Sequence, residues 1–454
     1  MATDRGVAER LGRLVERVLG AALPLRLRGW DGSEWGPEGT PVLVIRDRKA
    51  LRRLLWQPNE LGLGRAYVAG DLELDGDVYD ALGRLEGVLW QQPEQHGKPG
   101  GPSLLAGILD REVVREAVAL GAVGPQPRPP AEEASLRGIR HSLSRDRRAI
   151  SHHYDVGNDF YRLVLGESMV YSCAFWRSDN PGYGLADAQR DKLDLICRKL
   201  ALGPGMRLLD VGCGWGSLAI HAAREYGASV VGVTVSREQV EYARKRVAEA
   251  GLTDRVQIRL QDYREVDDDP FDAISSVGMA EHVGVERYAE YAALLYQRLR
   301  RGGRLLNHQI AALHPVEEPD KPGGVLGRLR GRPRSFIDAY VFPDGELAPV
   351  GTTVSLIEQA GFEVRDVEAL REHYGRTLRA WVANLEDNWD EVVRLTTPGR
   401  ARVWRLYMAG SALAFEAGRI GVNQILAVKA QRDGRSGMPP TREWLRTAST
   451  PPTD

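Results

Sequence analysis

The chain has 454 residues and a formal net charge of -1, with 61 Lys and Arg balanced by 62 Asp and Glu. The length favours two domains over one. The balanced charge excludes a general attraction to nucleic acid or to anionic membranes, so such contacts must come from local patches. Three sparse cysteines argue against a disulfide framework or a structural zinc site, and they fit a reducing cytoplasm.

The N-terminal segment is predicted to be part of the folded protein. Residues 1–20 carry charges throughout, unlike a signal peptide, and no apolar run reaches the roughly 18 residues of a spanning helix. Residues 5–19 have apolar side chains at helical spacing, and this stripe either packs on its own domain or rests on lipid headgroups. Short strands are predicted within residues 24–32 and 40–47, and a helix-and-turn segment over 61–86. Residues 1–123 are thus predicted to form a small α+β domain.

A change in composition follows this domain. Residues 124–134, GPQPRPPAEEA, contain four prolines and two glutamates and are predicted to form an extended, solvated linker. The next stretch either forms a solvated basic face or meets anionic headgroups, through Arg137, Arg140, Arg145, Arg147 and Arg148.

From about residue 190 the pattern alternates between strands and helices. Strands are predicted over residues 206–212, 228–235, 255–263, 271–279 and 304–311, and helices over 217–227, 236–251 and 286–303. This alternation predicts a mostly parallel sheet with helices on both faces. Ligands of such sheets bind outside the carboxyl ends of the strands.

The first of these strands ends in a glycine-rich turn, DVGCGWG, at residues 210–216. Its three glycines let the backbone turn sharply and approach a ligand. The turn is not a phosphate loop, because no Lys-Ser/Thr pair follows, and it matches the dinucleotide fingerprint poorly. Asp210 suits an ammonium group, residues 234–239 end the second strand where a ribose would lie, and Asp262 and Tyr263 follow the third strand where an adenine would lie.

These features together describe S-adenosylmethionine, and the arrangement resembles the class I methyltransferases. The resemblance implies an α/β, Rossmann-like, seven-stranded and mostly parallel sheet. One feature departs from the common pattern. The second strand usually ends in an acidic residue that holds the ribose hydroxyls, whereas this chain has Thr234 there. Gln239 is the candidate to take over that role.

Further motifs narrow the family. They are ISHHYDVGNDFYRLVLGESMVYSCAFW at 150–176, VGMAEHVG at 277–284, NHQI at 307–310 and HYGRTLRAW at 373–381. With the glycine turn, they make residues 135–454 resemble the cyclopropane fatty acid synthase family, and the N-terminal domain does so more faintly. The resemblance implies methyl transfer from S-adenosylmethionine to a cis double bond of a phospholipid acyl chain, with a bicarbonate ion near the methyl carbon. It also implies an N-terminal domain that engages lipid, at the inner face of the membrane.

The resemblance carries site residues with it. Those that match the bicarbonate site are Cys173, Glu281, His308, Ile310 (through its backbone) and Tyr374. The cofactor site is expected to contain Tyr171, Ser172, Asp210, Gly212, Gly214, Gly216, Thr234, Gln239, Asp262 and Tyr263. No metal is expected. Cys173 is alternatively a small buried hydrophobe, and Glu281 alternatively caps a helix. As a neighbour of an anion, Glu281 should orient a donor or share a proton, with a raised pKa.

The expected chemistry passes through a cation on the acyl chain, which must be kept from water. An apolar, aromatic pocket is predicted from Tyr154, Phe160, Tyr161, Phe175 and Trp176. His152 and His153 serve either this region or the core, and His282 is expected to support the site.

The cation has two outcomes. Immediate loss of a methyl proton closes a cyclopropane ring, whereas a prior hydride shift gives a methylene branch that a reductase partner would convert to a methyl branch. Ala280 stands where known cyclopropane synthases tend to carry Phe, which is a hint toward the methylene product. The complete bicarbonate set favours the cyclopropane.

Alternative functions and a further lipid contact are also considered. Four arginines between residues 328 and 334 could meet headgroups while Phe336 and Phe342 face the acyl chain. A small-molecule methyltransferase and a non-catalytic lipid carrier are alternatives, while the near-zero charge weighs against a nucleic-acid substrate. Oligomeric state is not readable, and a homodimer is one option.

Overall fold

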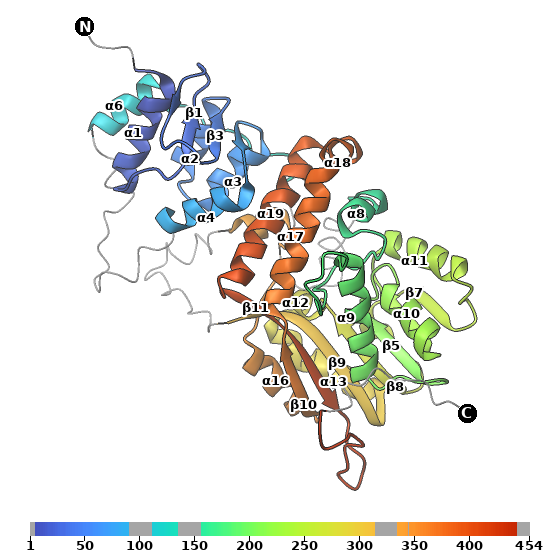
Figure 1. Cartoon of the computed structure of the whole chain (residues 1–454). Coiled ribbons are helices and arrows are strands. Elements are labelled where there is room, and N and C mark those ends of the chain that lie inside the picture. The colour runs from blue at the N-terminus through green and yellow to red at the C-terminus, as the bar shows by residue number, and fades with distance from the viewer. Residues whose placement is uncertain (1–4, 90–110, 135–155, 314–333, 344, 443–454) are drawn as a thin grey trace. The chain divides into compact units, whose positions relative to one another are not determined.

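The structure is a computed structural model that describes residues 5–89, 111–134, 156–313, 334–343 and 345–442 (Figure 1). The chain forms two compact units. The first comprises Met1–Ser135, Arg332–Val341 and Trp389–Leu413, and the second Leu136–Gly331, Phe342–Asn388 and Ala414–Asp454. The first unit therefore takes in the expected linker and two segments that the sequence placed in the catalytic domain.

The first unit contains a four-stranded sheet in the order β2-β1-β3-β4. The strands are β1 (Arg26–Arg28), β2 (Glu34–Trp35), β3 (Val42–Ile45) and β4 (Leu72–Asp75), with only β1 and β3 parallel. Its helices include α1 (Val7–Leu19), α2 (Lys49–Trp56), α3 (Glu60–Val68), α4 (Val78–Leu89) and α6 (Arg111–Ala119). The α+β composition is as predicted, but β4 lies where only helix and turn were expected.

Helix α1 packs on its own unit. Ala8 and Leu11 are buried in a hydrophobic cluster of this unit. On the polar side, Arg10 and Arg17 form ion pairs with Glu116 and Glu112 of α6. The alternative in which the apolar stripe packs internally is therefore confirmed, because that stripe is occupied.

Residues 124–134 contain no helix or strand, as predicted, but they are not a free linker. Arg65 of α3 forms an ion pair with Glu133 at 2.7 Å, and both side chains are mostly buried. The Arg53 guanidinium donates to the carbonyl of Arg128 at 2.8 Å. The segment is thus fastened along the first unit.

The arginines at 328–334, Phe336 and Phe342 belong to residues 323–347, of which the structure describes 334–343 and 345–347. This described part differs from the expected lipid contact. Phe336 begins α15 (Phe336–Tyr340) and is buried in the first unit, where it leaves no room for a side chain at Gly64 of α3. The prediction that Phe336 faces an acyl chain is therefore wrong. Arg334 lies 3.5 Å from Glu133, and Arg328, Arg330 and Arg332 lie outside the described residues.

The second unit is built on a seven-stranded sheet in the order β10-β11-β9-β8-β5-β6-β7. Strand β11 alone runs antiparallel to its neighbours, which confirms the mostly parallel sheet. The strands are β5 (Arg207–Val211), β6 (Ser229–Thr234), β7 (Val256–Leu260), β8 (Phe271–Val277), β9 (Leu299–Ala312), β10 (Glu363–Ala369) and β11 (Ile420–Val428).

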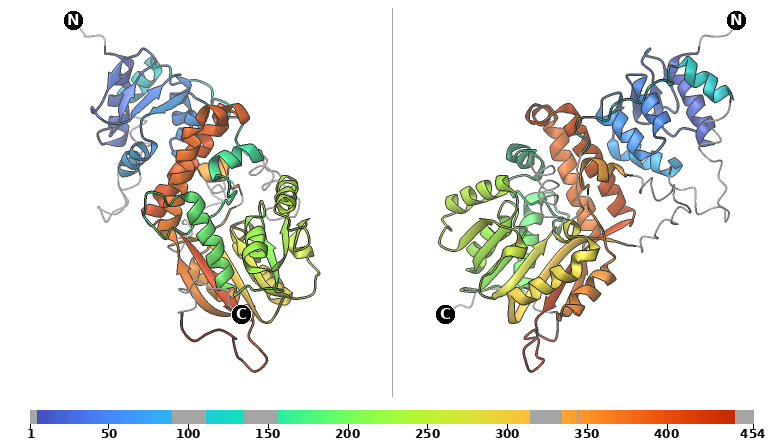
Figure 2. Two further views of the ribbon diagram at one scale, coloured as in Figure 1. Left: turned by 45° about the vertical axis from the view of Figure 1, so that its right-hand side comes forward. Right: turned by 180° about the vertical axis from the view of Figure 1, so that it is seen from behind.

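Two hydrophobic clusters cover the two faces of this sheet, because successive strand residues point to opposite sides. Leu208 packs in one cluster with α9 (Leu185–Lys199), α10 (Ser217–Tyr226) and α11 (Arg237–Glu249). Leu209 packs in the other with α13 (Tyr288–Arg298) and α16 (Val350–Gln359). The view from behind in Figure 2 brings the yellow α13 to the front of the sheet.

The remaining described elements complete the two units. Helix α8 (Asn158–Leu165) precedes the sheet, α12 (Ala280–Val283) follows β8, and short 3-10 turns lie at Tyr263–Glu265 and Val285–Arg287. Helices α17 (Arg371–Asp387), α18 (Trp389–Leu395) and α19 (Pro398–Glu416) come between β10 and β11. Within the described part of the chain, no helix combines the length and apolarity needed to cross a membrane.

Candidate active site

The glycine turn lies between β5 and α10, at the carboxyl end of β5. Gly212, Gly214 and Gly216 have φ values of 75°, 53° and 80°, a region that favours glycine. A Cβ atom at Gly212 would lie 2.3 Å from the Met279 side chain, so this position also needs the missing side chain. Gly216 is the N-cap of α10 and sets the direction of the helix.

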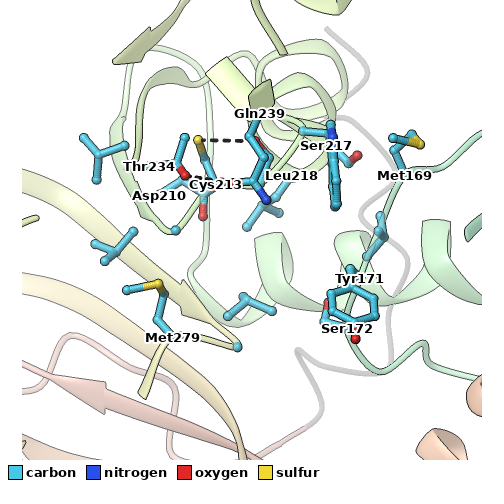
Figure 3. A pocket seen from close by; sticks show the side chains of 18 of the residues that line it. Met169, Tyr171, Ser172, Asp210, Cys213, Ser217, Leu218, Thr234, Gln239 and Met279 are labelled. Carbon is cyan, nitrogen blue, oxygen red and sulfur yellow. Dashed lines mark hydrogen bonds between the residues drawn. The ribbon is translucent and has the colours of Figure 1, made fainter. Parts of the chain in front are cut away.

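The turn borders a pocket at this end of the sheet (Figure 3). Figure 3 shows Tyr171 and Ser172 on one side of the pocket and Asp210 and Thr234 on another. Eight of the ten predicted cofactor residues line it, namely Tyr171, Ser172, Asp210, Gly212, Gly214, Thr234, Gln239 and Tyr263.

Gly216 and Asp262 do not line this pocket. Asp262 is buried, and its carboxylate accepts two hydrogen bonds from the Arg264 guanidinium, at 2.7 and 2.8 Å. Its carboxylate also caps the short turn Tyr263–Glu265 by accepting from the Arg264 amide. Asp262 thus holds Tyr263 at the pocket wall, and its own contact with the cofactor stays a prediction.

The wall beside the turn, at the end of β6, is polar. The Thr234 hydroxyl donates to Gln239 Oε1 at 2.7 Å, and both residues are buried. With its oxygen occupied in this way, Gln239 keeps its amide N–H groups as donors. The end of β6 therefore offers an amide donor where the sequence lacks the usual carboxylate.

Opposite charges lie together in the floor of the pocket. Asp210 is buried and accepts a hydrogen bond from Ser275 Oγ at 2.8 Å. Burial raises the pKa of Asp210 to about 6. Lys192 of α9 is also buried and lines the pocket, and its ammonium donates to Ser172 Oγ at 3.0 Å. Burial lowers the pKa of Lys192 to about 8, while the nearby Asp210 opposes this change.

Lys192 is a pocket residue that the sequence reasoning missed. The available signal is its position on the buried side of α9, where Ala188, Leu195 and Ile196 supply the apolar residues. A lysine in such a stripe either extends its charge to solvent or is held by a polar site. Met279, Trp215 and His282 also line the pocket.

The five residues predicted for the anion site are linked by a chain of contacts. Glu281 Oε1 accepts from the Ile310 amide at 2.7 Å. Ile310 pairs with Val422 of β11, and the Val422 carbonyl accepts from the Leu370 amide at 2.8 Å.

The Leu370 carbonyl continues this chain into the remaining members. It accepts from the Tyr374 amide at 3.1 Å and lies 3.6 Å from the Cys173 thiol. His308 is two residues before Ile310 in β9, and its Nδ1 lies 3.2 Å from Gln424 Nε2 of β11. All five residues therefore gather around the ends of β9 and β11. None of them lines the glycine-turn pocket itself, although the neighbours Ser172 and His282 do.

Two polar atoms of this group are buried and have no hydrogen-bond partner among the described residues. They are Glu281 Oε2 and His308 Nε2. Burial raises the pKa of Glu281 to about 7, even though the residue as a whole is only half-buried. Burial lowers the pKa of His308 to about 3, so the ring is neutral. With Gln424 donating to Nδ1, the ring carries its proton on Nε2.

Cys173 is not built as a nucleophile. Its thiol is buried between the carbonyls of Ala174 and Leu370, and burial raises its pKa far above the ordinary value. A thiol in this state behaves as a small hydrophobe and weak donor. This agrees with a supporting role beside an anion.

Four of the five aromatic residues predicted for the acyl-chain pocket are among the described residues, and their assignment to that pocket stays a prediction. Phe160 and Tyr161 are fully buried, and Tyr161 packs against Tyr171 and Trp215. Phe175 stacks on His373 with ring centroids 5.0 Å apart. None of these three lines the glycine-turn pocket, nor does Trp176, whose indole donates to Thr377. They build the wall behind it, while Tyr154, His152 and His153 lie outside the described residues.

Ala280, which carried the hint toward a methylene product, lies in the core of the second unit. It is buried in the hydrophobic cluster that also holds Val283 and Tyr288, and it does not line the pocket. Its small side chain is accommodated by core packing, and the hint toward a methylene product stays a prediction.

Comparison with known proteins agrees with this arrangement. The sequence profile described as "Mycolic acid cyclopropane synthetase" matches residues 141–425. A "Probable fatty acid methyltransferase" of Pseudomonas putida is 40% identical over 439 residues, which cover 95% of this chain and 99% of that protein. "Tuberculostearic acid methyltransferase UfaA1" of Mycobacterium tuberculosis is 33% identical over 421 residues, covering 91% and 89%.

A solved structure resembles the catalytic part. It is titled "Crystal Structure of mycolic acid cyclopropane synthase CmaA1 complexed with SAH and CTAB" and is 35% identical, with a TM-score of 0.57. The match covers 62% of this chain and 98% of that one. The chain belongs to the mycolic acid cyclopropane synthetase family of S-adenosylmethionine-dependent methyltransferases.

Proposed function

We propose that the protein transfers the methyl group of S-adenosylmethionine to the cis double bond of an unsaturated phospholipid acyl chain and forms a cyclopropane ring. The observation that carries this proposal is the contact chain from Glu281 through Ile310 and Leu370 to Tyr374 and Cys173, beside the glycine-turn pocket. This contact chain joins residues that the family resemblance assigns to the anion site, and it lies next to the cofactor pocket.

The charges of the pocket fit S-adenosylmethionine. The amino-acid end of this molecule carries one ammonium and one carboxylate, and the pocket has one buried carboxylate, Asp210, and one buried ammonium, Lys192. The Gln239 amide is available for the ribose hydroxyls, and Tyr263 for the adenine face. When bound, the cofactor would supply an electrophilic methyl group.

The group around Glu281 fits a small anion such as bicarbonate. His308 presents an Nε2–H donor that has no partner among the described residues. With a pKa of about 7, Glu281 is protonated in a large fraction of molecules near neutral pH, so its Oε2 can donate to the anion rather than repel it. A bound bicarbonate would supply a base in a site where Cys173, Tyr374 and His308 offer none.

The proposed reaction balances as follows. The alkene electrons form a bond to the methyl carbon, the bond from that carbon to sulfur breaks, and the adjacent acyl carbon becomes cationic. A proton then leaves the added methyl group, and its bonding electrons close the ring onto the cationic carbon. The buried walls of Phe160, Tyr161 and Trp215 keep this part of the unit dry, which prevents water from trapping the cation.

The methylene product is the second candidate. Its support is the match to a tuberculostearic acid methyltransferase over 91% of the chain, since this relative shares the first unit as well as the second. In this outcome a hydride moves to the cationic carbon before the methyl group loses its proton. A separate reductase partner would then be needed to reach a methyl branch.

The experiment uses purified protein, methyl-labelled S-adenosylmethionine and detergent-dispersed dioleoyl phospholipid, with products identified by mass spectrometry after derivatisation. A labelled ring is expected, whereas a labelled exocyclic methylene would establish the second candidate. If the protein binds the cofactor but yields no labelled lipid, the phospholipid acyl chain is not the methyl acceptor. Removing bicarbonate from the buffer should lower the rate and restoring it should recover the rate.

A second comparison tests the anion site. Glu281→Gln should lower the turnover number by roughly a hundredfold or more, the scale of lost general-base catalysis, because an amide cannot share a proton with the bicarbonate that acts as the base. Glu286→Gln, an exposed position in the following turn, is the matched control and should keep full activity.

A further inference from the structure

An exposed apolar patch lies on the first unit. In the described part of the chain, eight large hydrophobic residues are exposed, and four of them fall in α2, α6 and the loop after α6. These four are Trp56 at 56% exposed, Val114 at 44%, Val118 at 56% and Val123 at 58%. Isolated exposed residues need no explanation, but a cluster does.

Contacts between backbone and side chains bring these residues into one region. The Trp56 indole donates to the carbonyl of Gly124 at 3.0 Å, next to Val123. One turn earlier in α2, Arg52 donates to the carbonyl of Gly121 at 3.1 Å. The Gly121 amide in turn bonds the Val118 carbonyl at the end of α6. The end of α2 therefore contacts the loop that follows α6.

Helix α6 adds arginines to the patch. Arg111, Val114, Arg115 and Val118 follow the spacing of a single helix face, and all four are exposed. The opposite side is buried through Val113 and Ala117. We call the exposed side the α6 face.

The acidic residues of α6 do not weaken this positive charge. Glu112 and Glu116 are paired with Arg17 and Arg10 of α1. Arg111 and Arg115 form no ion pair with a described residue. The α6 face is therefore cationic as well as apolar, although the whole chain is nearly neutral.

We infer that the α6 face, with Trp56 and Val123, is the surface by which the first unit docks on a phospholipid bilayer with anionic headgroups. This inference rests on the proposed function, which requires access to phospholipid acyl chains. Valine and tryptophan side chains enter the headgroup and acyl boundary, while arginines pair with headgroup phosphates. The occupied stripe of α1 leaves this face, rather than α1, as the lipid contact.

The test measures partition of the full chain into sedimented vesicles of phosphatidylglycerol and phosphatidylethanolamine. Val118→Asp with Trp56→Ser should weaken partition at least tenfold, and Arg111→Glu with Arg115→Glu should remove the preference for phosphatidylglycerol. Matched controls in the second unit are Leu260→Asp, at a position 46% exposed, and the exposed pair Arg287→Glu with Arg432→Glu. The controls should partition like the unaltered protein.

The outcomes separate this inference from the proposed function. Activity on detergent-dispersed phospholipid should be unchanged in all variants, because none of these residues belongs to the catalytic unit's pocket. Equal losses in the patch and control variants, or no vesicle binding by the unaltered protein, would overturn the docking surface while leaving the activity intact. A change in sedimentation coefficient without a change in vesicle binding would assign the face to self-association instead.

Discussion

Replacing Glu281 with glutamine should remove a pH dependence of stability that comes from burial of one carboxyl group. Burial raises the pKa of Glu281 from 4.5 to about 7. A carboxyl whose pKa is raised by folding contributes stability below its unfolded pKa, and this contribution is lost as the pH rises through the folded pKa. The second unit should therefore lose stability between pH about 4.5 and about 7.

The size of this loss follows from the shift. A difference of about 2.5 pKa units at about 1.4 kcal/mol per unit corresponds to about 3–4 kcal/mol. In Glu281→Gln the loss is absent, because an amide does not titrate. The amide oxygen can still accept from the Ile310 N–H, so the local hydrogen bond seen in the structure is kept.

Hydrogen exchange followed by mass spectrometry is the suitable assay, because it reports opening of individual strands in a chain with two units. Protection of peptides from β9 and β11 is compared between the unaltered protein and Glu281→Gln at each pH from about 5 to about 8. Comparison at equal pH cancels the intrinsic pH effect on exchange. Glu286→Gln is the control.

The expected result is a protection ratio between Glu281→Gln and the unaltered protein that increases as the pH rises toward 7, while the control ratio stays flat. A ratio for Glu281→Gln that is independent of pH would refute the reasoning. It would mean that the carboxylate is solvated or paired in solution.

Three further results are expected. Gly212→Ala should destabilise the second unit by roughly 1–3 kcal/mol through strain at positive φ, and it should also weaken S-adenosylmethionine binding by displacing Met279. The control Gly205→Ala, with φ 78° and open space around it, should show only the strain. Equal cofactor affinities of the two variants by calorimetry would contradict this expectation. Lys192→Met should weaken cofactor binding by roughly tenfold to a hundredfold, the scale of a lost charged hydrogen bond. In the unaltered protein the affinity should fall above pH about 8 as Lys192 loses its proton, and this fall should be absent in the variant. The same pH profile in both proteins would exclude Lys192 as a partner of the cofactor. The three buried cysteines should resist iodoacetamide in the native protein and react in urea, and native labelling at Cys173 would contradict its burial.

The alternating part of the second unit was predictable because its signals are local. Strands β5 to β9 and helices α10, α11 and α13 each show an apolar run or stripe with glycine, serine or turn residues at the ends. The glycine turn was predictable for the same reason, since its three positive φ angles can be read from three glycines. Six of the eight predicted pocket residues lie in that frame, whereas Tyr171 and Ser172 were predicted from the family resemblance.

The rest depends on contacts between distant segments. Nothing local shows that β11 inserts between β9 and β10, or that residues 332–341 and 389–413 belong with the N-terminal unit. Lys192 was missed because a single lysine in α9 gives no sign of its buried partner Ser172. Phe336 was assigned to lipid because an aromatic residue looks the same in a sequence whether it lines a pocket or fills a core.

The place of β11 has a consequence for biosynthesis. This strand is the last described element of the chain, yet it lies between two earlier strands and supplies Gln424 to His308. The first unit is also incomplete until residues 389–413 have been made, since Arg402 pairs there with Glu73. Neither unit can therefore finish folding while the ribosome is still working through the middle of the message. A translation product that ends before β11 would contain the whole glycine turn but not the contact between Gln424 and His308. We therefore expect such a product to have the residues of the cofactor pocket and no catalytic activity.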